Sequence, residues 1–230
     1  MGLRGTQVVS VVPDAGAFRF SCADGYSGVA KKVLLATGLR DVLPDLAGIV
    51  PLYGCSVHHC LYCDGFEYAG RPLAAYGKAD KGAGLALMMR HWSADVVLLT
   101  DGAAAPSVEL QSRLAEHGIA SIGKPVAELE GDGRSLRRVR FTDGTVLARD
   151  ALFFATACEQ KSDLSRQLGC VRDDKGGVVT DAVTEETSVA GVYVAGDVSR
   201  DVLLVAVAMG EGAKAGVAIN RALLRTEGLI

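Results

Sequence analysis

A glycine loop between a strand and a helix is the feature that most constrains how this 230-residue chain can fold. The apolar run Pro72 to Tyr76 predicts a short strand, and Leu85 to Trp92 predicts a helix. The loop has the pattern G-x-A-x-x-G, formed by Gly77, Ala79 and Gly82. Such a turn is typical of dinucleotide-binding α/β units, in which amides at the helix N-terminus hold a pyrophosphate. Because the methyl group of Ala79 narrows the space in which a pyrophosphate could approach the backbone, an alternative stays open: the unit keeps the fold of a dinucleotide-binding unit but binds no nucleotide.

The strand after this helix, Asp95 to Thr100, ends at an acid that could bind a ribose. Asp101 lies 24 residues after Gly77, where a carboxylate in such units accepts from the 2′-hydroxyl. No basic residue accompanies it in Thr100-Asp101-Gly102, so a 2′-phosphate would lack a partner there. The pattern therefore disfavours NADPH relative to NADH or to no nucleotide.

Alternating strands and helices are predicted on both sides of the loop. After Asp101 we expect a helix followed by four strands, over residues 107–117, 119–122, 126–130, 136–141 and 151–156. Nearer the N-terminus we expect strands over residues 6–12, 18–22 and 29–37, the last of which runs into Gly38. Nearer the C-terminus we expect strands over residues 177–180 and 191–195, and a long helix over residues 201–224 that is interrupted near 209–212. This order predicts an α/β protein.

Asp197 follows Gly196 at the end of an expected strand, where α/β folds bind their ligands. The alternative is an acid that only stabilises the start of a helix through the helix dipole. These residues by themselves favour the second interpretation.

Two thiols two residues apart, Cys60 and Cys63, are followed by the carboxylate of Asp64. In a reducing compartment, such a pair among strands and helices indicates a redox dithiol rather than a structural cross-link. A thiolate of the pair would be the nucleophile, and its neighbour would resolve the mixed disulfide. Asp64 could return a proton to the leaving sulfur.

The paired histidines His58 and His59 directly before the dithiol raise the question of a metal site. Adjacent residues rarely point at one ion, and no second Cys-x-x-Cys pair accompanies the first, so we expect no metal. A loop hydrogen bond or acid/base support of the thiols is the simpler role for these histidines. The other cysteines are best interpreted as small buried apolar residues: Cys22, Cys55, Cys158 and Cys170.

Composition excludes several classes of protein. The formal net charge is −3 and no basic face is visible, which argues against a nucleic-acid partner. No apolar run approaches the length of about 18 residues that a membrane span needs, and the N-terminus lacks a signal-peptide core. We therefore expect a cytoplasmic protein without membrane contacts.

Taken together, these motifs resemble the thioredoxin-reductase-like flavoproteins of the FAD/NAD(P)-dependent pyridine nucleotide-disulfide oxidoreductases. The matching stretches occur in the family's order: Leu34 to Gly38, Cys60 to Gly65, Gly77 to Gly82, Val194 to Asp197 and Gly210 to Gly212. The resemblance implies a Rossmann-like nucleotide domain inserted in a partial FAD-binding α/β domain. The flavin domain would cover residues 1–40, a β-meander, and 155–230, and the inserted domain with the dithiol would cover residues 41–154.

The resemblance also implies a mechanism. Reduced nicotinamide would pass a hydride to FAD, and the flavin would reduce the Cys60–Cys63 disulfide, with Asp64 as acid/base. Thr37 and Gly38 would approach the flavin, Asp197 would bind its ribityl chain, and backbone groups of Leu204 and Val205 would meet the ring edge. The substrate would be a thioredoxin-like protein or a small disulfide or dithiol, and family members are commonly homodimers.

One departure from the family leaves alternatives open. The family's flavin domain opens with its own strand, G-x-G-x-x-G turn and helix, and nothing before Leu34 matches it. We therefore expect either a fragment of a longer product or a shortened gene. Some family members are dithiol oxidases that pass electrons through FAD to oxygen without nicotinamide, and Tyr62 and the paired histidines resemble those members. A nucleotide-binding module without turnover is the third possibility.

Overall fold

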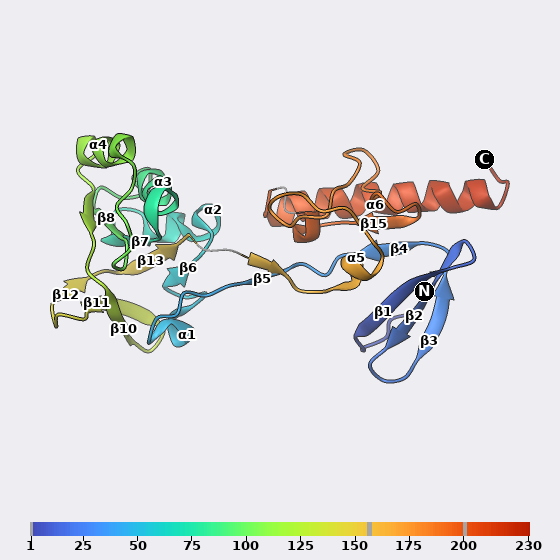
Figure 1. The fold of residues 1–230 in the computed structure, drawn as a ribbon, viewed down its shortest axis with the longest axis horizontal. Coiled ribbons are helices and arrows are strands. Elements are labelled where there is room, and N and C mark those ends of the chain that lie inside the picture. The colour runs from blue at the N-terminus through green and yellow to red at the C-terminus, as the bar shows by residue number, and fades with distance from the viewer. Residues whose placement is uncertain (1, 156–157, 200–201) are drawn as a thin grey trace. The chain divides into compact units, whose positions relative to one another are not determined.

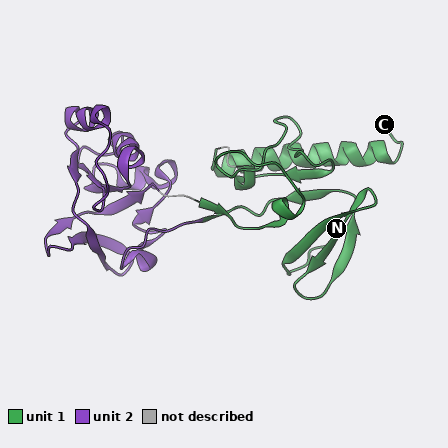
Figure 2. Ribbon diagram, viewed as in Figure 1, with its two compact units in different colours: residues 1–40, 158–230 green, residues 41–157 purple. Residues whose placement is uncertain are grey.

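The computed structural model describes residues 2–155, 158–199 and 202–230. The chain forms two compact units (Figure 2), one of residues 1–40 and 158–230 and the other of residues 41–157. The second expected boundary, at residues 154/155, falls inside the unit of residues 41–157. We call these the outer unit and the inserted unit.

The inserted unit is built on a five-stranded parallel sheet in the order β6-β13-β7-β8-β9. These strands span Val57–His58, Ala151–Phe154, Leu73–Tyr76, Val96–Leu99 and Ala120–Ile122. Every residue of β7, β8 and β13 is buried, as expected for strands covered on both faces. The continuous apolar runs in the sequence correspond to this double coverage.

Alternate residues of these strands enter two different cores. Leu73 and Ala75 of β7 pack with α3 (Ala79–Met89) and α4 (Val108–Glu116) on one face of the sheet. Ala74 and Tyr76 pack on the other face against an antiparallel sheet. That sheet has the order β10-β11-β12, with strands Val126–Asp132, Ser135–Phe141 and Val146–Ala148. Figure 1 shows the resulting three layers, with α3 and α4 on one side and β10 to β12 on the other.

Three short helical segments lie in the chain before β7, on either side of β6. They are α1 (Ile49–Leu52), α2 (Leu61–Asp64) and the 3₁₀ turn η1 (Phe66–Tyr68). Ile49 and Leu52 belong to the core under the antiparallel sheet, whereas Leu61 belongs to the core under α3. Residues before and after β6 thereby help to cover the two faces of the parallel sheet.

The outer unit contains an antiparallel meander of β1 (Val8–Asp14), β2 (Ala17–Cys22) and β3 (Ser27–Ala30). It also contains a parallel pair, β4 (Val33–Leu35) with β15 (Val192–Val194). The other elements are β5 (Leu39–Asp41), which pairs with β14 (Cys158–Gln160), α5 (Leu164–Gln167), η2 (Asp197–Ser199) and α6 (Val205–Thr226). Val11, Phe18, Leu35 and Val194 are among the residues of its core.

The structure confirms the α/β class but corrects three expected elements. The single strand over residues 29–37 is two strands, because β3 pairs antiparallel with β2 while β4 pairs parallel with β15. Residues 177–180 form isolated bridges rather than a strand. The helix α6 runs without a break through residues 209–212, since a helix tolerates a glycine at a cost of about 1 kcal/mol. The expected start of that helix at residue 201, and the end of a strand at residue 156, lie outside the described residues.

Candidate active site

The dithiol begins α2, a helix of one turn. Cys60 and Cys63 form a disulfide whose Cα atoms are 5.3 Å apart. The amide of Cys63 donates to the Cys60 sulfur at 3.1 Å, and the amide of Asp64 donates to the Cys60 carbonyl at 3.3 Å. A hydrogen bond to sulfur favours its thiolate over its thiol, so the helical turn supports the nucleophilic form of Cys60. Tyr62, between the two cysteines, is 76% exposed.

The contacts around Gly65 explain why a glycine follows Asp64. A Cβ atom there would lie 2.6 Å from the Leu61 carbonyl oxygen and 2.9 Å from Nε1 of Trp92. A larger residue at this position would push α2 away from Trp92, which lies just after the end of α3. The Asp-Gly step thus holds the dithiol turn close to the body of the inserted unit.

The Asp64 carboxylate is paired with a buried histidine. Oδ2 of Asp64 lies 3.3 Å from Nδ1 of His58. His58 ends β6 and is 5% exposed, while the Asp64 side chain is 40% exposed. Burial lowers the pKa of His58, and the charge of Asp64 opposes part of this shift.

His59, the second histidine of the pair, lies close to a different carboxylate, that of Asp41. Tyr53 donates to Asp41 through its hydroxyl, and the same hydroxyl lies 3.1 Å from Nδ1 of His59. His59 is itself 3.6 Å from the Asp41 carboxylate. Burial, and then the hydrogen bond to Asp41, raise the pKa of Tyr53 above its ordinary value. Both histidines thus face carboxylates, and within the described residues no group of three or more His, Cys, Asp or Glu is arranged for a metal.

The glycine loop packs the start of α3 tightly against the end of β7. A Cβ on Gly82 would lie 2.3 Å from the Gly77 carbonyl oxygen, and a Cβ on Gly77 would lie 2.8 Å from the Gly82 Cα. Ala79 begins α3 with a left-handed φ of 45°, a conformation that glycine adopts more easily. The loop therefore has the close helix-to-strand packing expected of a nucleotide-binding turn.

A cavity of about 510 Å³ opens at this loop. It is lined by Val42, Leu43, Pro44, Asp45, Tyr76, Gly77, Lys78, Lys81, Asp101 and Ala155. Two lysines in the lining, Lys78 and Lys81, lie within the loop pattern itself and are exposed. Neither lysine was predicted as part of the site, because only the residues beside Asp101 were considered as partners for a phosphate, although the loop sequence contains both lysines.

Asp101 lines the same cavity, but both of its carboxylate oxygens already have partners. Oδ2 accepts from the Tyr76 hydroxyl at 2.6 Å, and Oδ1 accepts from the Val126 amide at 2.7 Å. Its backbone has a φ of 52°. Asp101 therefore ties the end of β8 to β7 and β10, and a ribose hydroxyl would have to share its remaining lone pairs.

In the outer unit, the parallel register brings the other predicted residues to one edge. Leu35 pairs with Val194, so Thr37-Gly38 and Gly196-Asp197 leave β4 and β15 on the same side. Gly38 and Gly196 have φ values of 67° and 75°. A Cβ on Gly196 would lie 3.4 Å from Cβ of Ala208, so the first turns of α6 pack against this turn.

Glu211 holds that edge together and was not predicted. It lies in α6, is 6% exposed, and accepts a hydrogen bond from the Gly196 amide at 2.6 Å. Leu204 and Val205 at the start of α6 are 37% and 78% exposed. The signal in the sequence was an acid between two glycines, Gly210 and Gly212, a stretch that we interpreted as a break in a helix and as part of the family resemblance, without a role for Glu211 itself.

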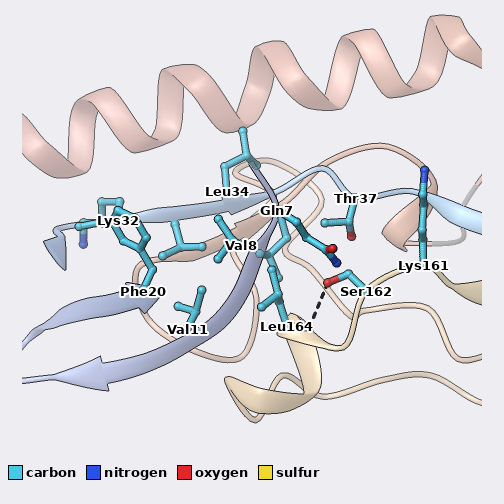
Figure 3. A pocket seen from close by; sticks show the side chains of 13 residues that line it. Gln7, Val8, Val11, Phe20, Lys32, Leu34, Thr37, Lys161, Ser162 and Leu164 are labelled. Carbon is cyan, nitrogen blue, oxygen red and sulfur yellow. Dashed lines mark hydrogen bonds between the residues drawn. The ribbon is translucent and has the colours of Figure 1, made fainter. Parts of the chain in front are cut away.

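A largely apolar cavity of about 630 Å³ also opens in the outer unit (Figure 3). Val8 and Val11 of β1, Phe20 of β2 and Leu164 of α5 supply apolar lining. Thr37, Lys161 and Ser162 lie together at one end of it (Figure 3). Thr37 therefore borders both this cavity and the edge that Gly38 and Gly196 form.

The chain thus combines a Cys-x-x-Cys disulfide with a Rossmann-like unit that has a parallel sheet and a glycine loop. The chain belongs to the pyridine nucleotide-disulphide oxidoreductase family, whose model matches residues 1–212.

Individual relatives agree with this assignment. The chain is 29% identical over 206 residues to thioredoxin reductase tcpT of Claviceps purpurea, covering 85% of this chain and 63% of that protein. The structure of an oxidoreductase from Agrobacterium tumefaciens has a TM-score of 0.86 at 29% identity, covering 95% of this chain and 73% of the other. The structure of HlmI has a TM-score of 0.91 at 30% identity, covering 96% and 70%. The chain thus spans somewhat less than two thirds of the length of the curated relative.

No helix in the described part of the chain is both long enough and apolar enough to cross a membrane.

Proposed function

We propose that this chain is a thioredoxin-reductase-like thiol–disulfide oxidoreductase whose reacting group is the Cys60–Cys63 pair. The observation that carries the proposal is the disulfide at the start of α2, followed directly by an Asp64 carboxylate that contacts His58. A structural cross-link would not need an acid with a buried histidine partner. A redox dithiol does, because each exchange step moves a proton together with a sulfur.

The exchange requires only residues of the inserted unit and a partner disulfide. A thiolate of the reduced pair attacks one sulfur of the partner disulfide, and the partner's second sulfur leaves as a thiolate that takes up a proton. The other cysteine of the pair then attacks the mixed disulfide and releases the partner's first sulfur, which is also protonated. The partner gains two electrons and two protons, and Cys60 and Cys63 return to the disulfide. Asp64 would donate and recover the proton.

Residues of the outer unit fit part of a flavin site. Thr37, Gly38, Gly196 and Asp197 gather at one sheet edge, and space within 4 Å of a Cβ built on Gly38 is empty, so a ligand can approach the backbone there. Leu204 and Val205 would meet a ligand at the start of α6, and Glu211 would hold the Gly196 amide in place. FAD, when bound, would supply two-electron transfer between reduced nicotinamide and the disulfide.

The cavity at the glycine loop supports reduced nicotinamide as the electron source. Gly77 and Gly82 let the start of α3 pack directly on the end of β7, and Lys78 and Lys81 offer positive charge to a pyrophosphate. Ala79 at the second position restricts that approach. The choice between NADH and NADPH depends on Asp101, whose acidic side chain disfavours a 2′-phosphate.

A dithiol oxidase that uses oxygen instead of nicotinamide is the second candidate. The observation in its favour is that Asp101 already accepts hydrogen bonds from Tyr76 and Val126, which weakens its case as a ribose ligand. In that function Cys60 and Cys63 would accept electrons from a small dithiol.

The partner class follows from the exposure of the dithiol turn. Tyr62, between the two cysteines, and Phe66, three residues after Cys63, are 76% and 75% exposed, so two exposed aromatic side chains lie close to the reacting pair in the chain. A thioredoxin-like protein with its own exposed disulfide, or a small organic disulfide, would suit these exposed aromatic side chains. Association of two copies through the outer unit stays a prediction.

The test is a single turnover by the chemically reduced full chain. The protein is reduced with a phosphine, freed of reductant, mixed with an oxidised thioredoxin and alkylated at set times, and its cysteines are then assigned by mass spectrometry. We expect Cys60 and Cys63 to become protected as a disulfide while the thioredoxin becomes alkylated. Cys63→Ser should abolish the transfer beyond a mixed disulfide.

Cys55→Ser is the matched control, because Cys55 is a partly exposed thiol of the same unit that has no cysteine partner. It should transfer electrons like the parent chain. Loss of transfer in Cys55→Ser, or retention in Cys63→Ser, would contradict the proposal. The visible spectrum of the purified chain separates the two candidate enzymes. Bleaching of a bound flavin by NADH supports the reductase, and bleaching only by a dithiol with oxygen uptake supports the oxidase. A chain without flavin absorption would contradict both enzyme functions and leave only a dithiol-bearing module.

A further inference from the structure

His58 is an imidazole in a place that ordinary packing does not explain. Its side chain is 5% exposed, and its Nε2 atom is buried without a hydrogen-bond partner in the described structure. Its Nδ1 atom faces Oδ2 of Asp64 at 3.3 Å. Burying a polar ring with one nitrogen unsatisfied costs about 1–3 kcal/mol, so the remaining contact must have a compensating role.

The ring is held firmly in this orientation. His58 stacks on Phe153 of β13 with ring centroids 5.3 Å apart and an interplanar angle of 28°. Tyr68 of η1 covers it at 5.5 Å in a tilted arrangement. Tyr68 in turn is fixed by Phe153, which meets it edge-on, and by its hydroxyl, which donates to the Cys55 carbonyl. These contacts therefore hold Nδ1 of the imidazole towards the Asp64 carboxylate.

The charges around the ring favour a neutral imidazole. Burial lowers the pKa of His58 and the charge of neighbouring His59 acts in the same direction, whereas Asp64 and the Cys55 carbonyl act against it. Burial raises the pKa of Tyr68, so its hydroxyl keeps its proton and adds no charge next to the ring. A neutral ring carries a single N–H, and Nδ1 is the nitrogen that faces the Asp64 carboxylate, at 3.3 Å.

We propose that His58 is a positioning residue that holds the Asp64 carboxylate beside the Cys60–Cys63 pair and thereby sets the pH dependence of thiol reactivity. The inference rests on the proposed thiol–disulfide exchange, in which Asp64 handles the proton. Asp64 is 40% exposed and directly follows Cys63. Without a fixed partner, its side chain would turn freely into solvent. A buried donor restricts it to the side of α2 that faces β6.

The test compares two amide variants of similar polarity. The side-chain nitrogen of His58→Asn stands where Nδ1 does and can still donate to Asp64, whereas that of His58→Gln stands nearer the position of Nε2 and cannot. The full chain is reduced, and the rate of its reaction with iodoacetamide at Cys60 and Cys63 is followed from about pH 5 to pH 10, a range that covers ordinary thiols. The alkylated peptides are separated by mass spectrometry, so Cys55 does not interfere.

We expect His58→Asn to follow the parent profile and His58→Gln to shift its midpoint by about 0.5–1 pH unit, the size of effect that the loss of one hydrogen bond of ordinary strength produces. In an Asp64→Asn background, His58→Gln should add no further shift, because its effect acts through the carboxylate. Far-ultraviolet circular dichroism checks that both variants fold. If His58→Gln instead unfolds the chain, the comparison of His58→Asn with the parent in both backgrounds decides.

Three results would overturn the inference: a His58→Gln profile that coincides with the parent, a His58→Asn shift equal to that of His58→Gln, or a shift that persists without the Asp64 carboxylate. None of these outcomes affects the electron transfer to oxidised thioredoxin that tests the proposed function. A chain that reacts with iodoacetamide as expected but fails to reduce thioredoxin would refute only the proposed function.

Discussion

A single methyl group at Gly82 should destabilise the inserted unit. The Cβ of Gly82→Ala would lie 2.3 Å from the Gly77 carbonyl oxygen and 2.6 Å from its carbonyl carbon. Ordinary contact begins at about 3.5 Å, so α3 would have to move by about 1 Å away from the end of β7. The obstacle is backbone at the end of a fully buried strand, and no side-chain rotation can relieve it.

The magnitude follows from comparison with a second glycine of the same helix. A Cβ on Gly84 would meet nothing within 4 Å. Replacing either glycine by alanine gains about 0.5–1 kcal/mol of helix stability, so this contribution cancels when the two variants are compared. The remaining difference is the cost of overpacking, which is about 1–3 kcal/mol. We therefore expect Gly84→Ala to be slightly more stable than the parent and Gly82→Ala to be less stable than Gly84→Ala by that amount.

Urea unfolding followed by tryptophan fluorescence measures this difference in the correct unit. Trp92 is the only tryptophan of the chain and lies just after α3, so its signal reports on the inserted unit. Equal unfolding free energies for the two variants, or a more stable Gly82→Ala, would refute the close packing of the glycine loop. A loss of stability in Gly84→Ala of the same size would show that the effect comes from the helix rather than from the contact.

Two further predictions concern the residues around Asp101 and the turn after β11. Tyr76→Phe removes a 2.6 Å hydrogen bond to a carboxylate from a tyrosine that is 7% exposed, and urea unfolding should show a loss of about 1–2 kcal/mol; no loss would mean that Asp101 does not tie β8 to β7. The pKa of Asp143 is lowered by Lys124 and then by Thr145, so its ionised form stabilises the folded chain above about pH 4, and this contribution is lost as the pH falls further. Asp143→Asn should therefore lower the urea midpoint at about pH 6 and make less difference at about pH 3; an equal effect at both pH values would contradict the assignment.

Local sequence predicted the longer strands and the two longer helices of the inserted unit, but not the short elements α1, β6, α2, η1 and β12. Four-residue apolar runs such as Leu73–Tyr76 and Ala151–Phe154 are typical of strands covered on both faces, and a glycine pattern follows the first of them. The family also followed from motifs, because Cys-x-x-Cys-Asp-Gly places its reacting groups within six consecutive residues. The split of residues 29–37 into β3 and β4 could not be predicted, since it depends on a pairing with β15 almost 160 residues later.

The contacts of the residues around the dithiol could not be predicted from the sequence for the same reason. The sequence contains His58 and Asp64 close together, but only the burial of the ring against Phe153 and Tyr68 turns His58 towards the carboxylate. Likewise, only the folded structure shows that Asp41 and Tyr53 lie beside His59 and that the Asp101 carboxylate accepts a hydrogen bond from the Val126 amide at the start of β10.

The glycine loop marks the division between the two kinds of information. The sequence by itself determined that a strand, a tight turn and a helix must follow one another at residues 73–89, because hydrophobic periodicity and the conformational range of glycine are local properties. Only the tertiary structure decided that Lys78 and Lys81 line a cavity and that Asp101 is already hydrogen-bonded. The strengths of these contacts depend on burial and on distances between residues far apart in the chain, and no local pattern encodes either quantity.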